Sequence, residues 1–393
     1  MVLKEVNSKQ LINEFLQLPM RIHKAYPLWI RPLDKDIEAV FNPEQNKYFR
    51  HGEIDRWILV NDQGETIGRV AAFINRKTAD TFEQPTGGMG FFECIDDQSA
   101  ANLLFDTCKN WLQKREMEAM DGPINFGDRD RWWGLLVKGF DLEPNYCSPY
   151  NPPYYQQLFE NYGFQLYFNQ YTYARNVREI DIDQELAVRI RTKAKPIREN
   201  PDFSFRHIEK KYLAKYAEDF RYIYNKAWVK HLGVKEMSQE QAVSIMKKMK
   251  PLLDERLIWF GYFKNEPVAF YIGLPELNQI FKYMNGRLDL LGKLTFLYHK
   301  KMKTVKKMFG VSFGVIPEWQ GKEVETALID AFSEIAWHKS FEYNYVEMNW
   351  IGDFNPKMMH IIKSLGTHIV KTHVTYRKLF DDNKTFKRSP IIE

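Results

Sequence analysis

The sequence predicts an α/β protein of mixed α+β type, built from two tandem copies of one domain. Two pairs of matching segments carry this prediction. An apolar strand pattern led by Trp57 turns before Glu65, and a second pattern led by Trp259 turns before Glu266. An Asn-Pro helix start at Asn151-Pro152 is matched by another at Asn355-Pro356. Both pairs occur in the same order at a spacing of about 200 residues, which indicates a duplicated unit.

The composition is that of a globular protein large enough for two hydrophobic cores. The chain has 393 residues, of which 44% are apolar and 27% charged, and its formal net charge is +5. Because basic and acidic residues nearly balance, we expect no nucleic-acid partner. Residues 1–10 lack the apolar stretch of a signal peptide, and no long apolar run follows. We therefore expect a cytoplasmic protein with no membrane partner.

The cysteines favour a reducing compartment and no metal. The chain has three, Cys94, Cys108 and Cys147, and none forms a CxxC pair. An odd and sparse set of this kind is typical neither of a disulfide framework nor of a zinc site.

In the first half, turn residues and apolar periodicity separate the expected elements. Ser8 caps a helix that ends before Pro19, and alternation around the Asn61–Gly64 turn predicts a hairpin. Apolar residues three, four and seven apart then predict a helix capped by Asp96 or Asp97. The expected order is a helix at 8–18, an irregular arm at 26–52, a hairpin at 56–76, a strand at 91–95, a helix at 98–112 and a helix ending at Gly163.

A polar stretch at 176–200, which contains Pro196 and is followed by Pro201, predicts the boundary between the halves, so we expect domains at 1–178 and 179–393. The second half then repeats the pattern of the first. Its expected elements are helices at 210–230 and 238–250, a hairpin at 257–273, a helix at 290–308, a strand at 311–315, a helix at 323–339, a strand at 345–349, a helix from Asn355 and a strand near 373–379.

This order, together with the segment that follows Val315, resembles the GNAT (GCN5-related N-acetyltransferase) superfamily. In that family a strand ending in Val leads to Gln/Arg-x-x-Gly-x-Gly/Ala at the start of a helix, and the segment after Val315 keeps Gln320, followed by Gly321. The resemblance implies that exposed N–H groups at the helix start hold the pyrophosphate of acetyl-CoA or another acyl-CoA, with no metal. The implied cofactor-binding residues are Val315, Gln320, Gly321, Lys322, Glu323, Val324, Glu325 and Asn355.

The second half departs from the family pattern at three positions. Glu323 and Glu325 stand where the family usually has small residues, and their carboxylates would repel a pyrophosphate. Ile362 stands where the family commonly has a tyrosine that protonates the departing thiolate, so that role has no residue there.

The first half is further from the motif, because its helix starts with Asp96-Asp97-Gln98 and has no glycine. It resembles a GNAT domain whose cofactor site is lost or altered. The chain as a whole, over about 10–380, resembles bacterial tandem GNAT-like proteins. Segments that match them are Phe15–Pro19, Gly68–Phe73, Gly90–Glu93, Gly122–Phe126, Asn225–Trp228 and Leu274–Asn278.

Acyl transfer to an amine needs a base for the ammonium proton, and Glu347 is a candidate because its strand precedes Asn355. The alternative is an ordinary strand glutamate that faces solvent. Tyr376, on the closing strand, is a candidate acid, and the alternative is a residue packed on the sheet.

Two groups of residues are candidates for holding a substrate. Asp128 and Asp130, beside Trp132 and Trp133, suit a cationic molecule, although Arg129 and Arg131 offer internal partners instead. A cleft between the halves is the expected place for a second group, which consists of Trp228, His231 and Asn278.

The first hypothesis is therefore an acyl-CoA-dependent N-acyltransferase. A small-molecule amine would attack the thioester directly, without a covalent enzyme intermediate. The main alternative is a non-catalytic ligand-binding or scaffolding protein that kept the fold and lost acyl-CoA. A third interpretation, an aminoacyl or peptidyl transferase that uses a tRNA donor, is disfavoured by the modest net charge.

Overall fold

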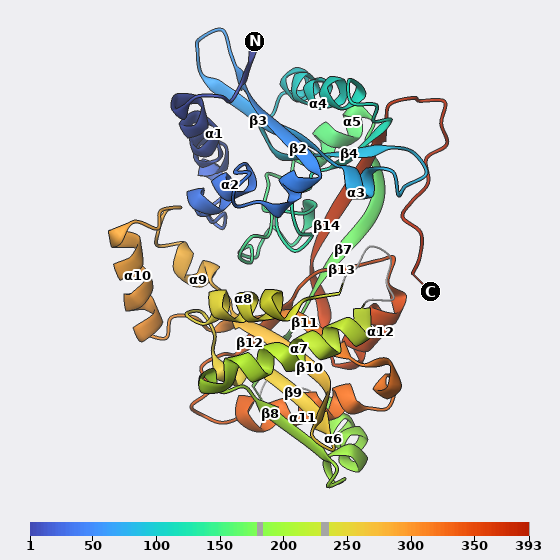
Figure 1. The fold of residues 1–393 in the computed structure, drawn as a ribbon. Helices are drawn as coiled ribbons and strands as arrows, with labels where there is room; N and C mark the ends of the chain where they lie inside the picture. Colours follow the sequence, from blue (N-terminus) through green and yellow to red (C-terminus); the bar gives the residue numbers. More distant parts are fainter. Residues whose placement is uncertain (179–183, 229–235, 393) are drawn as a thin grey trace.

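The structure is a computed structural model that describes residues 1–178, 184–228 and 236–392. Two lobes lie one above the other, and two long strands, β7 (Gln165–Asn176) and β14 (His368–Leu379), run from one lobe to the other (Figure 1). All strands belong to one 14-stranded sheet in this described part of the chain. The predicted mixed sheet flanked by helices is confirmed.

The upper lobe holds most of the first half. Its elements are β1 (Val2–Glu5), α1 (Lys9–Ile22), α2 (Asp34–Val40), β2 (Gly52–Val60), β3 (Thr66–Asn75), α3 (Arg76–Ala79), β4 (Thr86–Cys94), α4 (Gln98–Gln113), β5 (Ala119–Gly122), β6 (Leu135–Lys138) and α5 (Tyr155–Tyr162).

The lower lobe holds most of the second half. Its elements are α6 (Gln184–Arg198), β8 (Phe203–His207), α7 (Leu213–Trp228), α8 (Gln239–Met249), β9 (Ile258–Phe263), β10 (Glu266–Pro275), α9 (Asn278–Phe281), α10 (Leu290–Lys301), β11 (Lys307–Val315), α11 (Val324–Ala336), β12 (Tyr345–Met348), β13 (Ile351–Gly352) and α12 (Pro356–Ser364).

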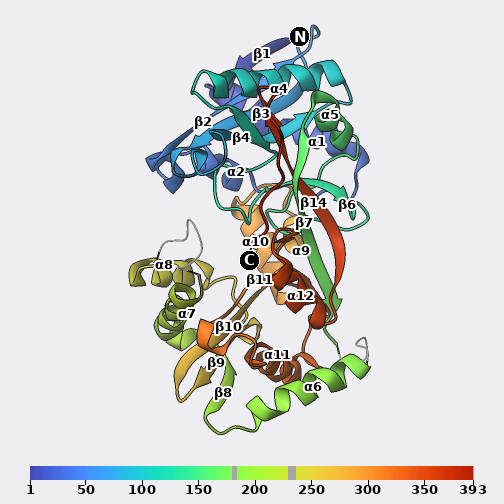
Figure 2. The ribbon, with the colours of Figure 1, turned by 90° about the vertical axis from the view of Figure 1, so that its right-hand side faces the viewer.

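The two halves exchange their last strands. Strand order across the middle of the sheet is β5-β14-β7-β12, so β14 pairs with β5 of the first half and β7 pairs with β12 of the second. Figure 2 shows the two strands spanning both lobes side by side. The hydrophobic core of the first half accordingly includes Val374 and Tyr376. The division at residue 178 stays a prediction, because each lobe is completed by a strand from the other half.

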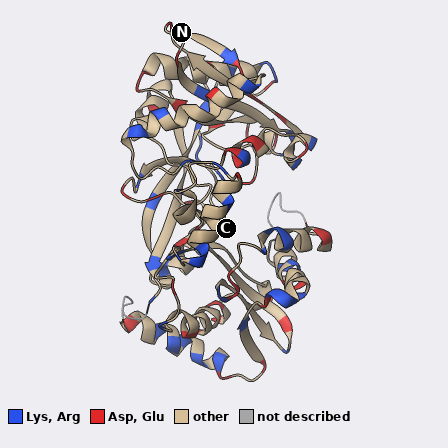
Figure 3. Cartoon of the chain, turned by 90° about the vertical axis from the view of Figure 1, so that its left-hand side faces the viewer, with Lys and Arg blue, Asp and Glu red and all other residues tan. Residues whose placement is uncertain are grey.

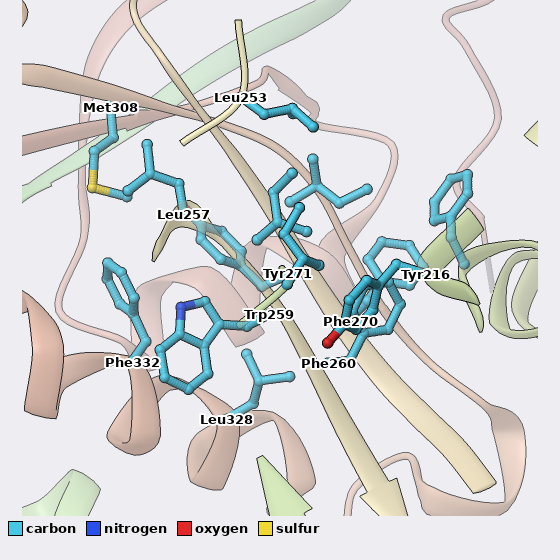
Figure 4. Close-up of a cluster of buried hydrophobic side chains, with 14 of the residues drawn as sticks. Tyr216, Leu253, Leu257, Trp259, Phe260, Phe270, Tyr271, Met308, Leu328 and Phe332 are labelled. Atoms are coloured by element: carbon cyan, nitrogen blue, oxygen red, sulfur yellow. The ribbon is translucent and has the colours of Figure 1, made fainter. Parts of the chain in front are cut away.

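The largest core lies in the lower lobe, between the sheet and the helices on its two faces. Figure 4 shows part of it, with Trp259 and Phe332 on one side and Phe260, Phe270 and Tyr216 on the other. Trp259 and Phe260 are successive residues of β9 and so point to opposite faces of the sheet, where Phe332 of α11 and Tyr216 of α7 cover them. Helices α6 and α11 pack together over one face.

The predicted elements match the structure best where the periodicity is strong, and several differ. Helix α1 continues through Pro19 to Ile22, four residues past the expected end at residue 18. Helix α10 ends at Lys301 rather than near 308, and β11 begins at Lys307. The polar stretch expected as a linker contains α6, which has Pro196 in its last turn. Strands β1 and β8 and helix α2 were not predicted.

Candidate functional site

In each half, one parallel pair of strands separates after a few residues. In the second half β11 and β12 pair from Lys307 to Gly310, and β12 ends at Met348 while β11 continues to Val315. A register shift against β10 leaves Val311 as an extra residue in β11. Such a bulge bends a strand and re-aims its side chains. The two strands therefore no longer pair beyond Gly310, and we call this break in the pairing, directly before the predicted cofactor motif, the gap.

The start of α11 is open at the end of β11. Gly321 has a φ of +70°, and a Cβ built there would meet no atom within 4 Å. The side chain of the N-cap residue, Glu323, accepts from no backbone N–H of the first turn, so these N–H groups at the positive end of the helix dipole have no side-chain cap. Gln320 lies beside this turn and donates from Nε2 to the Val315 carbonyl at 2.9 Å. These features suit an anion at the helix start.

The two glutamates of this turn differ in their partners. Glu323 accepts from Lys193 Nζ at 3.0 Å and from the Thr326 hydroxyl at 2.7 Å. Partial burial acts to raise the pKa of Glu323, but these two donors outweigh it and lower the pKa. Burial raises the pKa of Glu325. The repulsion expected from the sequence is therefore reduced by Lys193, since this cation neutralises one of the two carboxylates.

The other predicted residues of this motif have structural partners. Val315 is buried at the end of β11, and Val324 is buried in the first turn of α11. The Lys322 ammonium lies 5.1 Å from the centre of the Trp319 ring. Asn355 caps α12 by accepting from the Met358 N–H at 3.1 Å, and so orders the helix that follows the gap.

The equivalent place in the first half is filled by the chain itself. Asp97 caps α4, accepting from the Ala100 N–H at 2.9 Å, so this helix start has no free place for an anion. The segment after β5 crosses the gap beside β4, where a Cβ on Gly90 would lie 1.9 Å from the Ile124 carbonyl oxygen. That the first half has lost its cofactor site, as the missing glycines indicate, stays a prediction.

Glu347 lies in a buried charge cluster rather than on an open surface. Its exposure is 2%, and its two oxygens accept from Lys307 Nζ at 2.9 Å and from Lys371 Nζ at 2.5 Å. Asn145 donates to it at 2.8 Å. Burial acts to raise the pKa of Glu347, but the two lysines outweigh it and lower the pKa. A carboxylate held by three donors is a poor proton acceptor, so this geometry does not favour Glu347 as the base.

A second buried glutamate, Glu276, joins the halves beside this cluster. Its Oε1 accepts from the backbone N–H groups of Tyr146 and Asn278 at 2.8 and 2.9 Å. The predicted substrate residue Asn278 is buried and donates from Nδ2 to the Pro144 carbonyl at 2.9 Å. Asn278 therefore lies between the halves as expected, but it fixes the 144–146 segment rather than facing an open cleft.

Tyr376 lies in the first-half core, away from the start of α11. Its hydroxyl donates to Glu160 at 2.8 Å, and its ring stacks on Phe159. Burial and the hydrogen bond to Glu160 raise the pKa of Tyr376. The strand exchange carries Tyr376 into the other lobe, where these contacts fit the packing alternative, and the catalytic role of Tyr376 stays a prediction.

The Asp128–Trp133 loop faces both halves. Asp128 accepts from the Tyr48 hydroxyl at 2.8 Å and lies 3.2 Å from Lys47 Nζ, so its partners are not the neighbouring arginines. Asp130 is exposed. Arg129 lies 5.6 Å from the centre of the Trp133 ring, where a bound cation would otherwise sit, and its carbonyl accepts from the Trp350 indole.

Trp132 lines a first-half pocket of about 100 Å³ that sequence reasoning missed. At the wall of this pocket, Glu93 accepts from the Tyr155 hydroxyl at 2.8 Å and lies 3.0 Å from His23 Nε2 and 3.4 Å from Arg69. Glu93 ends the Gly90–Glu93 segment that matches the tandem GNAT-like proteins. That match was the available signal, but His23 is 70 residues away in the chain.

The remaining predicted substrate residues are not placed. His231 lies outside the described residues, and Trp228 ends α7 directly before that stretch, so the structure does not describe how its side chain lies.

Comparison with known proteins identifies the fold. No family model matches the chain. A tandem GNAT protein from the clavulanic acid biosynthesis pathway superposes with a TM-score of 0.52 at 12% identity, over 98% of this chain and 100% of that one. The chain has the tandem GNAT fold. The GCN5-related glucosamine N-acetyltransferase region of a fungal β-N-acetylglucosaminidase gives the same TM-score at 10% identity, over 96% of this chain and 38% of that one.

Two relatives match this tandem GNAT chain along nearly its full length. A bacterial ceramide synthase of Caulobacter vibrioides is 26% identical over 376 residues, which cover 93% of this chain and 94% of that protein. Protein YghO of Escherichia coli is 23% identical over 375 residues, which cover 94% of this chain and 93% of that protein. The predicted fold is confirmed.

Proposed function

We propose that this protein is an acyl-CoA-dependent N-acyltransferase that holds its acyl-CoA in the second half. One observation carries the proposal: α11 begins without a side-chain cap, after an open turn at Gly321, where β11 extends beyond its partner strand. The helix start and its dipole suit the pyrophosphate of the acyl-CoA. The gap beyond Gly310 suits the thioester arm, because the β11 edge there has no neighbouring strand in the described part of the sheet.

The proposed reaction needs no covalent enzyme intermediate. The neutral amine of the acceptor attacks the thioester carbonyl carbon, the C–N bond forms, and the C–S bond breaks to release the CoA thiolate. The amine loses one proton and the thiolate gains one, so protons balance. Holding both reactants in the gap supplies most of the catalysis in such a direct transfer, by orientation and exclusion of water.

The acceptor is proposed to be an amine on a long-chain molecule. The support is the relative named a bacterial ceramide synthase, since a ceramide is an N-acylated long-chain amine. This narrows the small amine expected from the sequence to an amphiphilic one.

The binding step is tested by titrating acetyl-CoA and palmitoyl-CoA into the protein in a calorimeter. Gly321→Asp introduces a carboxylate and a strained left-handed residue at the proposed phosphate site, and we expect affinity to fall about tenfold or more. Gly64→Asp is the matched control, because Gly64 also has a positive φ, of +83°, with no atom within 4 Å of a built Cβ. Equal binding by both variants and the unchanged protein would contradict the site.

The transfer step is tested separately, by thiol release and by mass spectrometry of the amide. We expect faster thiol release with a long-chain amino alcohol than with ethanolamine. A non-catalytic protein is the second candidate, favoured by the two carboxylates at the α11 start. If this second candidate is right, the protein is folded but binds neither acetyl-CoA nor palmitoyl-CoA and releases no thiol.

A further inference from the structure

Helix α10 exposes an apolar face to solvent. Four leucines, Leu290, Leu291, Leu294 and Leu297, are between 56% and 73% exposed, and Tyr298 and Met302 are about as exposed. We call these six residues the α10 apolar face. Single exposed leucines are ordinary on protein surfaces, but a contiguous group of this kind marks an interaction site. In Figure 1, α10 stands at the edge of the molecule, away from the sheet.

The leucines point outward because the opposite side of the helix is anchored. Phe296 packs against Phe281, with 6.2 Å between ring centres. His299 stacks on Tyr283 at 4.2 Å and hydrogen-bonds the Thr304 hydroxyl at 3.0 Å. At about 100° per residue, the apolar face covers an arc of about 140°, and Phe296 and His299 lie on the other side of the helix. The helix thus has two apolar sides, one packed on the protein and one free in this structure.

The charged side chains within α10 itself are all basic, and the nearest carboxylate along the chain, Asp289, caps the helix by accepting from the Gly292 N–H. From Leu290 to Pro317 the chain has no Asp or Glu. Lys293 and Lys300 lie along one border of the apolar face, and Lys301 lies within its last turn. Just after the helix, Lys303 makes only a long ion pair with Glu342, at 3.9 Å from Nζ to the carboxylate oxygen. Lys300 donates to the Pro251 carbonyl, an uncharged partner. Figure 3 shows the side of the molecule on which α10 lies.

From this juxtaposition we infer that α10 docks the protein on the surface of an anionic lipid bilayer. Leucines on one face and lysines at its border are the pattern of a helix that lies in the membrane interface, with the lysine stems reaching back to the lipid headgroups. The positive border is the observation that favours a bilayer over a second copy of the chain, since two such faces would bring lysines together. The helices of the described residues include none that is long and apolar enough to span a membrane.

This inference stands independently of the proposed acyl transfer. It revises the expectation of no membrane partner, which came from the balanced charge of the whole chain, because the charge is unbalanced locally. If the acceptor is a long-chain amine, docking through α10 places the protein where such molecules reside.

The test is flotation of the full-length protein with vesicles of phosphatidylcholine, with and without phosphatidylglycerol. We expect binding to the vesicles that contain phosphatidylglycerol. Leu294→Glu with Leu297→Glu should reduce that binding at least about tenfold. Val188→Glu with Ile245→Glu is the matched control, because these residues are also exposed, on α6 and α8, and the net-charge change is the same. Circular dichroism verifies that all variants are folded.

Three results would overturn the inference. One is the absence of binding to either vesicle, and another is binding by the leucine variant equal to that of the control. The third concerns the other possible occupant of this face. If light scattering shows a dimer that the leucine variant converts to a monomer, the α10 apolar face is covered by a second copy. Loss of acyl transfer with intact vesicle binding, by contrast, would contradict only the proposed function.

Discussion

Replacing Glu323 by glycine should tighten acyl-CoA binding without destabilising the protein. Glu323 sits at the N-cap of α11 with a φ of +60°, a conformation that costs a non-glycine residue about 1 kcal/mol. Glycine removes that cost, while the variant loses a partly exposed ion pair with Lys193 and a hydrogen bond from Thr326. Each loss is about 0.5–1 kcal/mol, so the net change in the free energy of unfolding is within about 1 kcal/mol of zero.

The effect on affinity follows from removing one negative charge beside the proposed pyrophosphate. Two unit charges about 6 Å apart repel by about 0.7 kcal/mol in water and about 3 kcal/mol at an effective dielectric constant of 20. The Glu323 side chain is 38% exposed, which favours the lower part of this range. We expect a gain of about 1 kcal/mol, or about fivefold in Kd, that shrinks as salt increases.

The matched control is Glu116→Gly, because Glu116 is also exposed and has a φ of +66° in the first half. Calorimetric titration with acetyl-CoA at low and high salt measures both variants. Glu116→Gly should share any stabilisation and leave Kd unchanged. If Glu323→Gly binds no more tightly than Glu116→Gly, the phosphates do not lie at α11 and the reasoning from its uncapped start is wrong.

Three further predictions concern the buried polar groups. Glu347→Gln leaves two buried lysines without a carboxylate and should lower the free energy of unfolding by about 3–5 kcal/mol in urea titrations; a change below about 1 kcal/mol would contradict the cluster. Tyr376→Phe removes a hydrogen bond to Glu160, so it should lower the free energy of unfolding by about 1 kcal/mol and leave turnover unchanged. A large loss of turnover would support a catalytic role for Tyr376. Burial lowers the pKa of His373 from 6.5 to about 4, so as pH falls the unfolded chain binds a proton before the folded one does. The free energy of unfolding should therefore drop by up to about 3 kcal/mol between pH 6.5 and pH 4. His373→Gln should reduce this dependence on pH.

The sequence predicted well those parts of the fold whose signals are local. The hairpins, α4, α11 and α12 follow from apolar periodicity, turn residues and caps that lie within each segment. It missed α6, because a polar segment with Pro196 has the composition of a linker, and α6 becomes a helix by packing on α11. The exchange of β7 and β14 could not be predicted, because β14 can close either sheet with the same alternation of side chains.

The candidate site divides in the same way. The cofactor motif from Val315 to Glu325 is contiguous in sequence, so its residues are found together in the structure. The partners of Glu347 are not contiguous: Lys307 lies on β11, Lys371 on β14 and Asn145 in the first half. The local sequence therefore offered only a base or an ordinary solvent-facing strand glutamate, because the buried ion pairs of Glu347 depend on residues far away in the chain.

The same cluster explains how the exchanged strands keep their register. Lys371 reaches Glu347 from β14, the strand that continues into the first half. A slip of β14 by one residue would turn every one of its side chains to the other face of the sheet. Glu347 would then keep Lys307 but lose Lys371, and the buried Lys371 ammonium would be left without its carboxylate at a cost of several kcal/mol. We infer that the buried charges contribute more to fixing the register of the exchanged strands than to the free energy of unfolding. Asn145, which donates to Glu347 from the first half, links this cluster to the contact between the halves.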